Sequence, residues 1–444
     1  MVRSALRCDT TQARFPNEEI VVWAKDISGA YTQLSFLPED VHLMSVLLDS
    51  EDVMFFVGGI FGLTGMPYAF DPVTRAIRWE LQRSVHGFAD IYIDDVMGAT
   101  CRRLVHEDMA RTDSLIQALF NEAAVARHKD RVGTCGEVIG FAVDIPQQLV
   151  TIAEQNVMRA LYGFLVVDTD RPVAVSLLER LAAWGSRYSE ICTLLRPLTH
   201  TLFAAFRGRS RHARVWLNDD TQVVVAVFRA LSALTVLQAR TYTRTLASFG
   251  SQQNDQTTLV FFDGSLTGAG AVVFHRASGI DTPVGWTALD LTSWGIRGMP
   301  EFQNTTELTA LAAGLLCAGA CGMDMSNVVI VGDSVTALTW ADTQRTHSLN
   351  ARNAGITLAL LSVIHEINVG EVHHIPAEQN TVCDGLSRGQ SWHDLTVADH
   401  PDWSDVREIS FGKERVAETC NPFEPLDVAS SLWVDAIASF GHQL

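Results

Sequence analysis

Four carboxylates in the second half of the sequence lie at the ends of predicted strands and helices: Asp263, Glu307, Asp333 and Asp384. Mg²⁺ and Mn²⁺ prefer oxygen ligands in proteins, and four carboxylates brought together can hold two such ions. Each of these residues taken alone is more often a turn residue or a helix cap. As a set they predict two-metal phosphoryl transfer or phosphodiester hydrolysis.

A second set of carboxylates lies in the first third of the chain. Asp26 ends an apolar strand predicted at 20–23, and Asp94 and Asp95 lie at the turn of a hairpin predicted at 87–96. A hairpin places two carboxylates at one tip, and a third on a neighbouring strand completes a cage for two divalent cations. This set suits transfer of a nucleotide to a 3′-hydroxyl.

Strands and helices alternate in the region that must position the second-half carboxylates. Apolar runs predict strands at 259–263, 270–275, 327–333 and 371–375. Helical periodicity predicts helices at 307–321, 334–340, 355–367 and 381–387. The polar segment 248–258 has no periodicity and predicts a linker, whereas 151–247 is mainly helical in pattern.

The charge of the chain argues against general binding to nucleic acid. Its 444 residues carry a net charge of −18, and phosphate contacts need cations. A local groove can still be basic, and one segment concentrates arginine at positions 207, 209, 211 and 214. These side chains could contact phosphates, or they could form a plain solvated loop.

The cysteines and the hydropathy of the chain indicate the cellular compartment in which the protein is expected. None of the eight cysteines forms a CxxC pair, which predicts free thiols in a reducing compartment. The N-terminal segment lacks the apolar stretch of a signal peptide. The longest uncharged run, 53–70, contains four glycines and Pro67, which favour a loop entering a helix over a membrane span. We expect an intracellular protein, cytoplasmic or nuclear, that is neither secreted nor membrane-bound.

Three ordered blocks in the first third resemble reverse transcriptases. They are Lys25–Tyr31, Phe61–Phe70 and Tyr92-Ile93-Asp94-Asp95. The resemblance implies that Asp26 and Asp94 bind both metals while Asp95 assists, and that Tyr31 is a gate against a 2′-hydroxyl. The other substrate-binding residues implied by the resemblance are Phe61, Gly62, Pro67 and Tyr92. The partners would be a template–primer nucleic acid and deoxynucleotides.

Weaker resemblances continue downstream. Residues 137–144 resemble the strand pair that grips the primer, and 184–199 resemble the thumb and connection helices of retrotransposon polymerases. Only 25 residues precede Asp26, where a reverse transcriptase carries the fingers subdomain that binds the triphosphate. We therefore expect a partial, truncated palm, which leaves polymerase activity open.

The second-half carboxylates lie in motifs that resemble ribonuclease H. These are Asp263-Gly264-Ser265, Glu307–Ala310, Gly332-Asp333-Ser334, His374–Asn380 and Asp384–Arg388. The resemblance implies that the four carboxylates hold two Mg²⁺ or Mn²⁺ ions and that Asn380 supports the site. His374 would assist protonation or product release. The substrate would be an RNA:DNA hybrid.

Together these features predict a retrotransposon-derived RNA-directed DNA polymerase with ribonuclease H activity, a nucleotidyltransferase joined to an endonuclease. We expect an α/β and α+β multidomain fold with a partial palm at 1–150, a thumb- or connection-like helical region at 151–247, and a linker at 248–258. A ribonuclease H-like α/β domain would occupy 259–390, followed by an acidic tail of unknown role at 391–444. Two alternatives stay open: a ribonuclease H with a relic palm, or a non-catalytic nucleic-acid-binding remnant.

Overall fold

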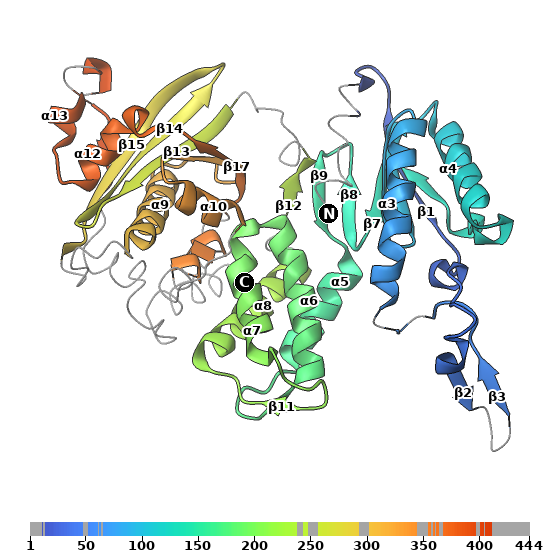
Figure 1. Cartoon of the computed structure of the whole chain (residues 1–444). Coiled ribbons are helices and arrows are strands. Elements are labelled where there is room, and N and C mark those ends of the chain that lie inside the picture. Colours follow the sequence, from blue (N-terminus) through green and yellow to red (C-terminus); the bar gives the residue numbers. More distant parts are fainter. Residues whose placement is uncertain are drawn as a thin grey trace. The chain divides into compact units, whose positions relative to one another are not determined.

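The structure is a computed structural model in which the chain divides into two units (Figure 1). The N-terminal unit comprises Met1–Ala153 and Thr245–Gln252, and the C-terminal unit comprises Glu154–Arg244 and Gln253–Leu444. The described residues are 11, 14–47, 52–60, 62–63, 65–237, 243–246, 256–292, 302–343, 354–356, 358–359, 361–363, 367–396, 400–403 and 405–410.

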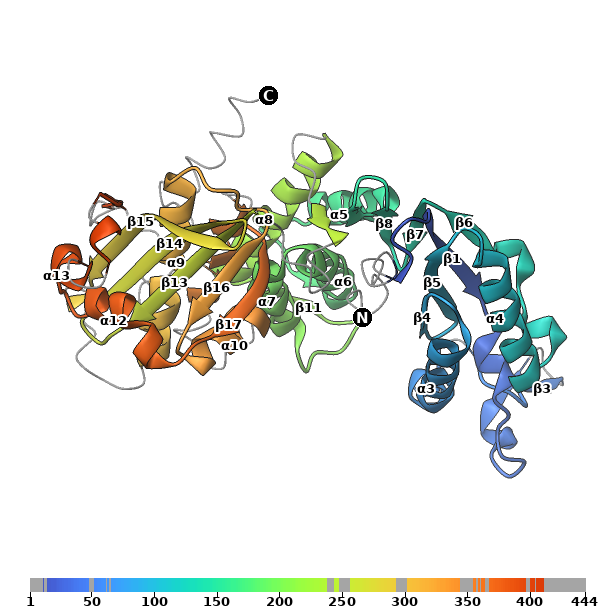
Figure 2. The same cartoon turned by 90° about the horizontal axis from the view of Figure 1, so that it is seen from above.

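A four-stranded antiparallel sheet of order β4-β5-β1-β6 forms the centre of the N-terminal unit. Its strands are β1 (Ile20–Asp26), β4 (Phe88–Tyr92), β5 (Asp95–Cys101) and β6 (Arg131–Gly133). Helices α3 (Met66–Ser84) and α4 (Val105–Leu119) pack on one face of it (Figure 2). The core between these layers includes Trp23, Ile77, Ile91 and Ile116, each at most 1% exposed.

Two short antiparallel sheets complete the described part of this unit. One pairs β2 (Ser45–Leu47) with β3 (Val53–Phe55), and the other contains β7 (Cys135–Val138), β8 (Phe141–Asp144) and β9 (Leu149–Ile152). The apolar run 138–143 predicts a single strand by pattern alone, but the structure divides it between β7 and β8. Ile139 and Gly140 adopt positive φ values of 48° and 81°, and this turn splits the run into the ends of β7 and β8.

Four helices open the C-terminal unit: α5 (Glu154–Leu165), α6 (Val175–Ile191), α7 (Arg196–Phe206) and α8 (Asp219–Val236). Phe164 and Phe228 stack in their core with ring centroids 5.3 Å apart. Asn218 caps α8 by accepting a 3.1 Å hydrogen bond from the Thr221 amide. Strands β10 (Val173–Ala174) and β11 (Arg214–Val215) pair beside these helices, and β12 (Thr243–Thr245) follows them in sequence.

A six-stranded mixed sheet of order β17-β16-β13-β14-β15-β18 follows. Strands β13 (Gln256–Gly264), β14 (Gly268–Ala277) and β15 (Ile280–Asp290) form an antiparallel meander. Strands β16 (Val328–Gly332) and β17 (Val369–His374) run parallel to β13. The central strand β13 reads as a continuous apolar run from Leu259 to Phe262 because both faces of the sheet are covered.

Alternation along β13 assigns its side chains to the two faces. Val260 faces α9 (Gln303–Ala320), where Gly314 leaves room for it. Leu259 and Phe261 face the opposite layer, a cluster that includes residues of α12 (Thr381–Ser387) and α13 (Trp392–Thr396). Helix α10 (Val335–Thr343) follows β16. The element order of this region agrees with the predicted alternation except for β15, a strand that the sequence pattern did not predict.

Part of the segment assigned to an acidic tail belongs to this sheet. Strand β18 (Arg407–Glu408) pairs in parallel with β15, and Trp392 stacks on Trp286 with ring centroids 5.2 Å apart. Residues 411–444 lie outside the described residues. The sheet and its covering layer therefore continue past residue 390, because these tryptophans bury apolar surface against β15.

In the part of the chain that the structure describes, no helix has both the length and the apolar character needed to cross a bilayer. The described cysteines, at positions 101, 135, 192, 317, 321 and 383, are all free thiols.

Candidate metal centre

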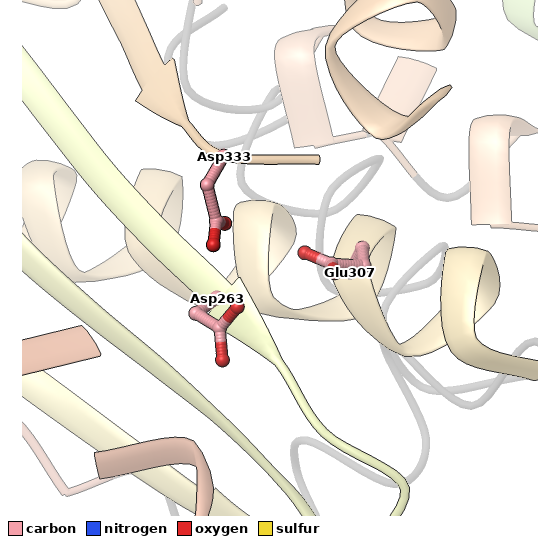
Figure 3. Close-up of side chains that lie close together, drawn as sticks. All are labelled: Asp263, Glu307 and Asp333. Carbon is pink, nitrogen blue, oxygen red and sulfur yellow. The ribbon is translucent and has the colours of Figure 1, made fainter. Parts of the chain in front are cut away.

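Asp263, Glu307 and Asp333 converge at one edge of the six-stranded sheet. Asp263 lies near the end of β13 and Asp333 directly follows β16, and these strands are parallel neighbours, so their carboxyl ends meet at the same edge. One ligand oxygen from each of the three residues lies within 4.8 Å of the others. Figure 3 shows the Asp333 and Glu307 carboxylates pointing toward the space beside Asp263. The site thus brings together three of the four predicted carboxylates.

Gly264 allows helix α9 to approach the end of β13. A Cβ atom at this position would lie 2.5 Å from the Glu307 amide nitrogen and 2.5 Å from the Thr306 carbonyl carbon. Both are backbone atoms, so any side chain would push the helix away. Helix α9 begins at Gln303, four residues earlier than predicted, and Glu307 therefore lies inside the helix and not at its start.

Neighbouring side chains and amides hold each carboxylate. The Ser387 hydroxyl donates to Asp263 Oδ2 at 2.7 Å, and Asn380 Nδ2 donates to Asp333 Oδ1 at 3.2 Å and to the Phe262 carbonyl at 3.0 Å. Gln303 Nε2 donates to Glu307 Oε1 at 3.2 Å and also to the Gly264 carbonyl. These bonds fix the orientation of the acids before any cation binds.

Burial changes the acidity of two members of the cluster. Asp263 is 6% exposed and Glu307 is 5% exposed. Desolvation, with the negative charges of Asp263 and Asp333, raises the pKa of Glu307 from 4.5 to about 8. Desolvation also raises the pKa of Asp263, against the Ser387 hydrogen bond, which lowers it. A divalent cation would offset the repulsion that these shifts report.

Asp384 and His374 lie beside the cluster but outside it. Asp384 Oδ1 accepts from Arg388 Nη2 at 2.6 Å and from Nε at 2.9 Å, one helical turn along α12. The exposed His374 Nε2 lies 3.1 Å from the Asp333 carbonyl oxygen, and donation to that oxygen leaves Nδ1 as an acceptor. Asp384 is thus positioned near the site with its charge paired to an arginine.

Sequence reasoning did not identify Gln303, and it gave no role to Ser387 and Arg388 although both lie in the 384–388 motif. Gln303 contacts Glu307 and Arg388 contacts Asp384, each four residues away, whereas Ser387 contacts Asp263, 124 residues away. The i,i+4 spacings of Gln303 to Glu307 and of Asp384 to Arg388 were readable as helix neighbours. The Ser387–Asp263 contact had no local signal.

In the N-terminal unit, Asp26 lies directly across from Asp95 in the β1–β5 register. Asp94 lies in the β4–β5 turn, where its carbonyl oxygen accepts from the Ile27 amide at 2.9 Å. Burial raises the pKa of both Asp94 and Asp95, and the charge of Asp26 adds to each shift. The negative charges of the three carboxylates therefore interact with one another, which is expected of residues that share a metal cage.

These carboxylates are less tightly gathered than those of the C-terminal unit. Within the described residues, Asp26, Asp94 and Asp95 do not form a group with ligand oxygens all within 4.8 Å. Lys129 Nζ instead donates to Asp26 Oδ2 at 2.8 Å. Ile93, a β-branched residue, has a φ of 58°, so the turn carries backbone strain beside these acids.

The predicted substrate-binding residues of this unit occupy varied environments. Tyr31 is 6% exposed, and its ring meets Phe70 edge-on at 5.8 Å. Tyr92 ends β4 next to the Asp94 turn, and Pro67 lies in the first turn of α3. Gly62 has a φ of 96°, with open space where a Cβ would lie. Phe61 lies outside the described residues.

The C-terminal cluster fits a divalent cation. Three converging carboxylates are the oxygen donor set that Mg²⁺ and Mn²⁺ prefer, and two of the three are buried with no cationic side chain among their hydrogen-bond partners within the described residues. An acidic triad that could bind a metal is therefore present, with two of its three members buried. The fourth acid needed for a second ion, Asp384, is held by Arg388.

Comparison with known proteins gives no sequence-level match: no family model and no curated protein matches this chain. Solved structures that it resembles include a foamy viral protease–reverse transcriptase dRH in complex with double-stranded DNA, with 12% identity and a TM-score of 0.38, covering 81% of this chain. A foamy viral protease–reverse transcriptase in complex with an RNA/DNA hybrid has 12% identity and a TM-score of 0.37, covering 80% of this chain and 44% of its own. The chain spans 58% of the first of these structures.

Proposed function

We propose that the C-terminal unit is a metal-dependent nuclease of the ribonuclease H kind, which hydrolyses the RNA strand of RNA:DNA hybrids. The observation that carries this proposal is the convergence of Asp263, Glu307 and Asp333 within 4.8 Å at the carboxyl edge of parallel strands. The sequence resemblance at these residues supplies the substrate class. An A-form-like hybrid would be read through its backbone and 2′-hydroxyls and not through its base sequence.

This proposal gives each residue of the site a separate role. When bound, two Mg²⁺ or Mn²⁺ ions would supply positive charge that stabilises the attacking and leaving oxygens. Asp263, Glu307 and Asp333 would hold them, with Asp384 released from Arg388 to complete the set. Asn380 would keep Asp333 oriented, as its 3.2 Å hydrogen bond supports. His374, exposed at the rim, would carry a proton to or from the leaving group.

The test is cleavage of a hybrid labelled on its RNA strand, with Mg²⁺ or Mn²⁺ and with EDTA, by the full chain and its Asp333→Asn variant. We expect cleavage that EDTA abolishes and that the variant loses by at least about 100-fold, because the cluster loses one of its charged ligands. Asp342→Asn is the control, an acid on α10 outside the cluster. Failure of the folded wild-type chain to cleave with either ion would contradict the proposal.

A second activity, RNA-directed DNA synthesis, is proposed for the N-terminal unit as a partial palm. The observation in its favour is the juxtaposition of Asp26 with Asp95 across β1 and β5 and of Asp94 at the adjoining turn. The substrates would be a template–primer and deoxynucleotides, with Asp26 and Asp94 as ligands for two ions. Extension of a labelled DNA primer on an RNA template, lost in Asp94→Asn, tests it.

Two narrower functions give different outcomes in the same assays. Hybrid cleavage without primer extension would indicate a ribonuclease H with a relic palm. Metal-independent hybrid binding without cleavage would indicate a non-catalytic nucleic-acid-binding protein. The division into a palm at 1–150, a helical region at 151–247, a linker at 248–258 and a nuclease domain from 259 belongs to this proposal, as does the origin in a retrotransposon.

A further inference from the structure

The loop between α7 and α8 concentrates positive charge in an otherwise acidic chain. Residues 206–217 contain four arginines and one histidine but no acid, whereas the chain as a whole carries a net charge of −18. The arginines are at positions 207, 209, 211 and 214, and all four side chains are exposed. We call residues 207–216 the arginine loop.

Short-range hydrogen bonds give the arginine loop a defined shape. The Arg209 amide donates to the Phe206 carbonyl at 3.0 Å, and the Ala213 amide donates to the Ser210 carbonyl at 2.9 Å. Gly208 takes a φ of 72° between the first two arginines, which turns the chain sharply. Pairing of β11 with β10 then fixes the end of the loop. The cations are therefore displayed on an ordered backbone.

Among the described residues, one of these four arginines pairs with an acid. Arg211 Nε pairs with Glu179 at 3.1 Å, and Arg214 Nε donates to the Pro172 carbonyl at 2.9 Å. Arg207 and Arg209 form no ion pair with an acid among the described residues. Exposed arginines without acidic partners attract phosphate, and the planar guanidinium can bind it through two hydrogen bonds.

Trp216 adds an aromatic surface directly after these arginines. Its side chain is 68% exposed, while the next residue, Leu217, is 6% exposed and anchors the chain in the helical core. An exposed tryptophan beside a basic strip is the arrangement on which unpaired bases stack while the strip binds their backbone. The bases of a duplex are stacked on one another and are therefore not available to stack on the Trp216 ring.

The arginine loop lies away from the six-stranded sheet. Arg196, at the start of α7, donates to the carbonyl oxygens of Asp342 and Thr343 in α10 at 3.2 and 3.4 Å. The loop begins at the other end of α7, about 15 Å along the helix axis. It therefore offers a contact separate from those made by the helix start.

We propose that the arginine loop is a binding surface for single-stranded nucleic acid, with Arg207 and Arg209 on the phosphates and Trp216 stacked on a base. This surface would hold a single-stranded extension of whatever nucleic acid the chain engages. The proposed binding is separate from the nuclease and polymerase activities proposed above. It can be measured without the divalent ions that those activities would need.

The test measures fluorescence anisotropy of a fluorescein-labelled 20-nucleotide oligothymidylate with the full chain in EDTA, from 50 to 200 mM NaCl. We expect Arg207→Gln/Arg209→Gln to weaken binding by about tenfold or more at low salt and to flatten the salt dependence, since each phosphate contact to a single strand contributes a slope of about −0.7. Trp216→Ala should weaken binding by about tenfold without changing the slope. Thermal unfolding of each variant verifies its fold.

The matched control is Arg102→Gln/Arg103→Gln, which removes two exposed arginines from the N-terminal unit. Equal binding by the loop variant and this control would overturn the proposal. Equal affinity for a blunt duplex, unaffected by Trp216→Ala, would overturn the choice of single strands. If the loop arginines instead support binding to phosphatidylserine vesicles and no oligonucleotide binds, the loop would be a membrane-binding surface and the proposal would be overturned.

Discussion

The hydroxyl of Ser387, at the last residue of α12, donates a 2.7 Å hydrogen bond to Asp263 Oδ2 at the end of β13. The two residues are 124 positions apart, and Ser387 is 1% exposed. Gly268 and Gly270 of β14 let this helix lie close, since a Cβ on either would come within 2.7 Å of α12 backbone atoms. The bond thereby holds the carboxylate in one orientation and favours its charged form, against the desolvation that raises the pKa of Asp263.

Ser387→Ala should shift the pH dependence of hybrid cleavage. The hydrogen bond lowers the pKa of Asp263, so its loss raises that pKa and leaves less of the charged form at low pH. With a hydrogen bond to a charged group worth about 1.5–3 kcal/mol, we expect about a tenfold loss of rate at pH 6 and a smaller loss at pH 8.5. Ser391→Ala, at an exposed serine, is the control. An equal loss at every pH would rule out this role.

Glu307→Gln should stabilise the metal-free chain in alkaline solution. The folded-state pKa of about 8 lies above the usual 4.5, so the folded protein binds the extra proton between these values and loses stability as the pH rises through them. Thermal unfolding in EDTA should therefore show a gain for the variant at pH 8.5 that is absent at pH 4.5. Glu39→Gln, at an exposed site, should show no such difference. A gain of the same size at both pH values would contradict the assignment.

Gly264→Ala should destabilise the C-terminal unit and abolish cleavage. The added methyl group would meet backbone atoms of Thr306 and Glu307 at 2.5 Å, which forces α9 away from β13. Overpacking of this kind costs about 1–3 kcal/mol, measurable by urea unfolding. Gly65→Ala is the matched control, because nothing lies within 4 Å of its Cβ position and its φ is −78°. A variant as stable and active as this control would show that the helix has room to move.

Arg388→Gln should lower the Mg²⁺ concentration needed for half-maximal cleavage by several-fold. The guanidinium now competes with a cation for Asp384, and its removal leaves that carboxylate available. The ion pair is partly exposed, at 61% and 41% for the two side chains, so stability should change by less than about 1 kcal/mol. Titration of the rate with Mg²⁺ measures the effect beside Arg276→Gln, which breaks a comparable pair with Asp281. A higher Mg²⁺ requirement would instead place Arg388 on the substrate.

Lys25→Met should strongly destabilise the N-terminal unit. The Lys25 ammonium is 3% exposed and lies 2.8 Å from Asp113 and 2.5 Å from Asp130. Its removal leaves two carboxylates without this buried cation, although the exposed Arg127 still lies 3.4 Å from Asp113. Breaking a buried pair in this way costs about 3–5 kcal/mol. Urea unfolding should reveal this loss, whereas Arg75→Gln, from an exposed pair with Asp71, should change little. A loss below about 1 kcal/mol would show that solvent already screens the pair.

The sequence alone determined the local elements and the residue types of both sites. Apolar runs defined β1, β13, β16 and β17, and α12 spans the predicted residues 381–387. The acids at the ends of these elements were identified because strand ends and charge changes are local features. The alternation of strands and helices in the second half predicted an α/β domain there, but not the order of the strands in its sheet.

Only the tertiary structure decided how these elements meet. Helical periodicity over residues 106–128 predicts one helix, but α4 ends at Leu119. The chain turns back there, so that the Ala124 carbonyl accepts from the Ser28 amide and the Ala126 amide donates to the Asp26 carbonyl. The Ser387 bond to Asp263, the Lys129 pair with Asp26 and the approach of α9 at Gly264 likewise join distant positions. The periodicity of a segment predicts whether that segment is a helix or a strand. These contacts depend on how separate elements pack together, which no short stretch of sequence determines.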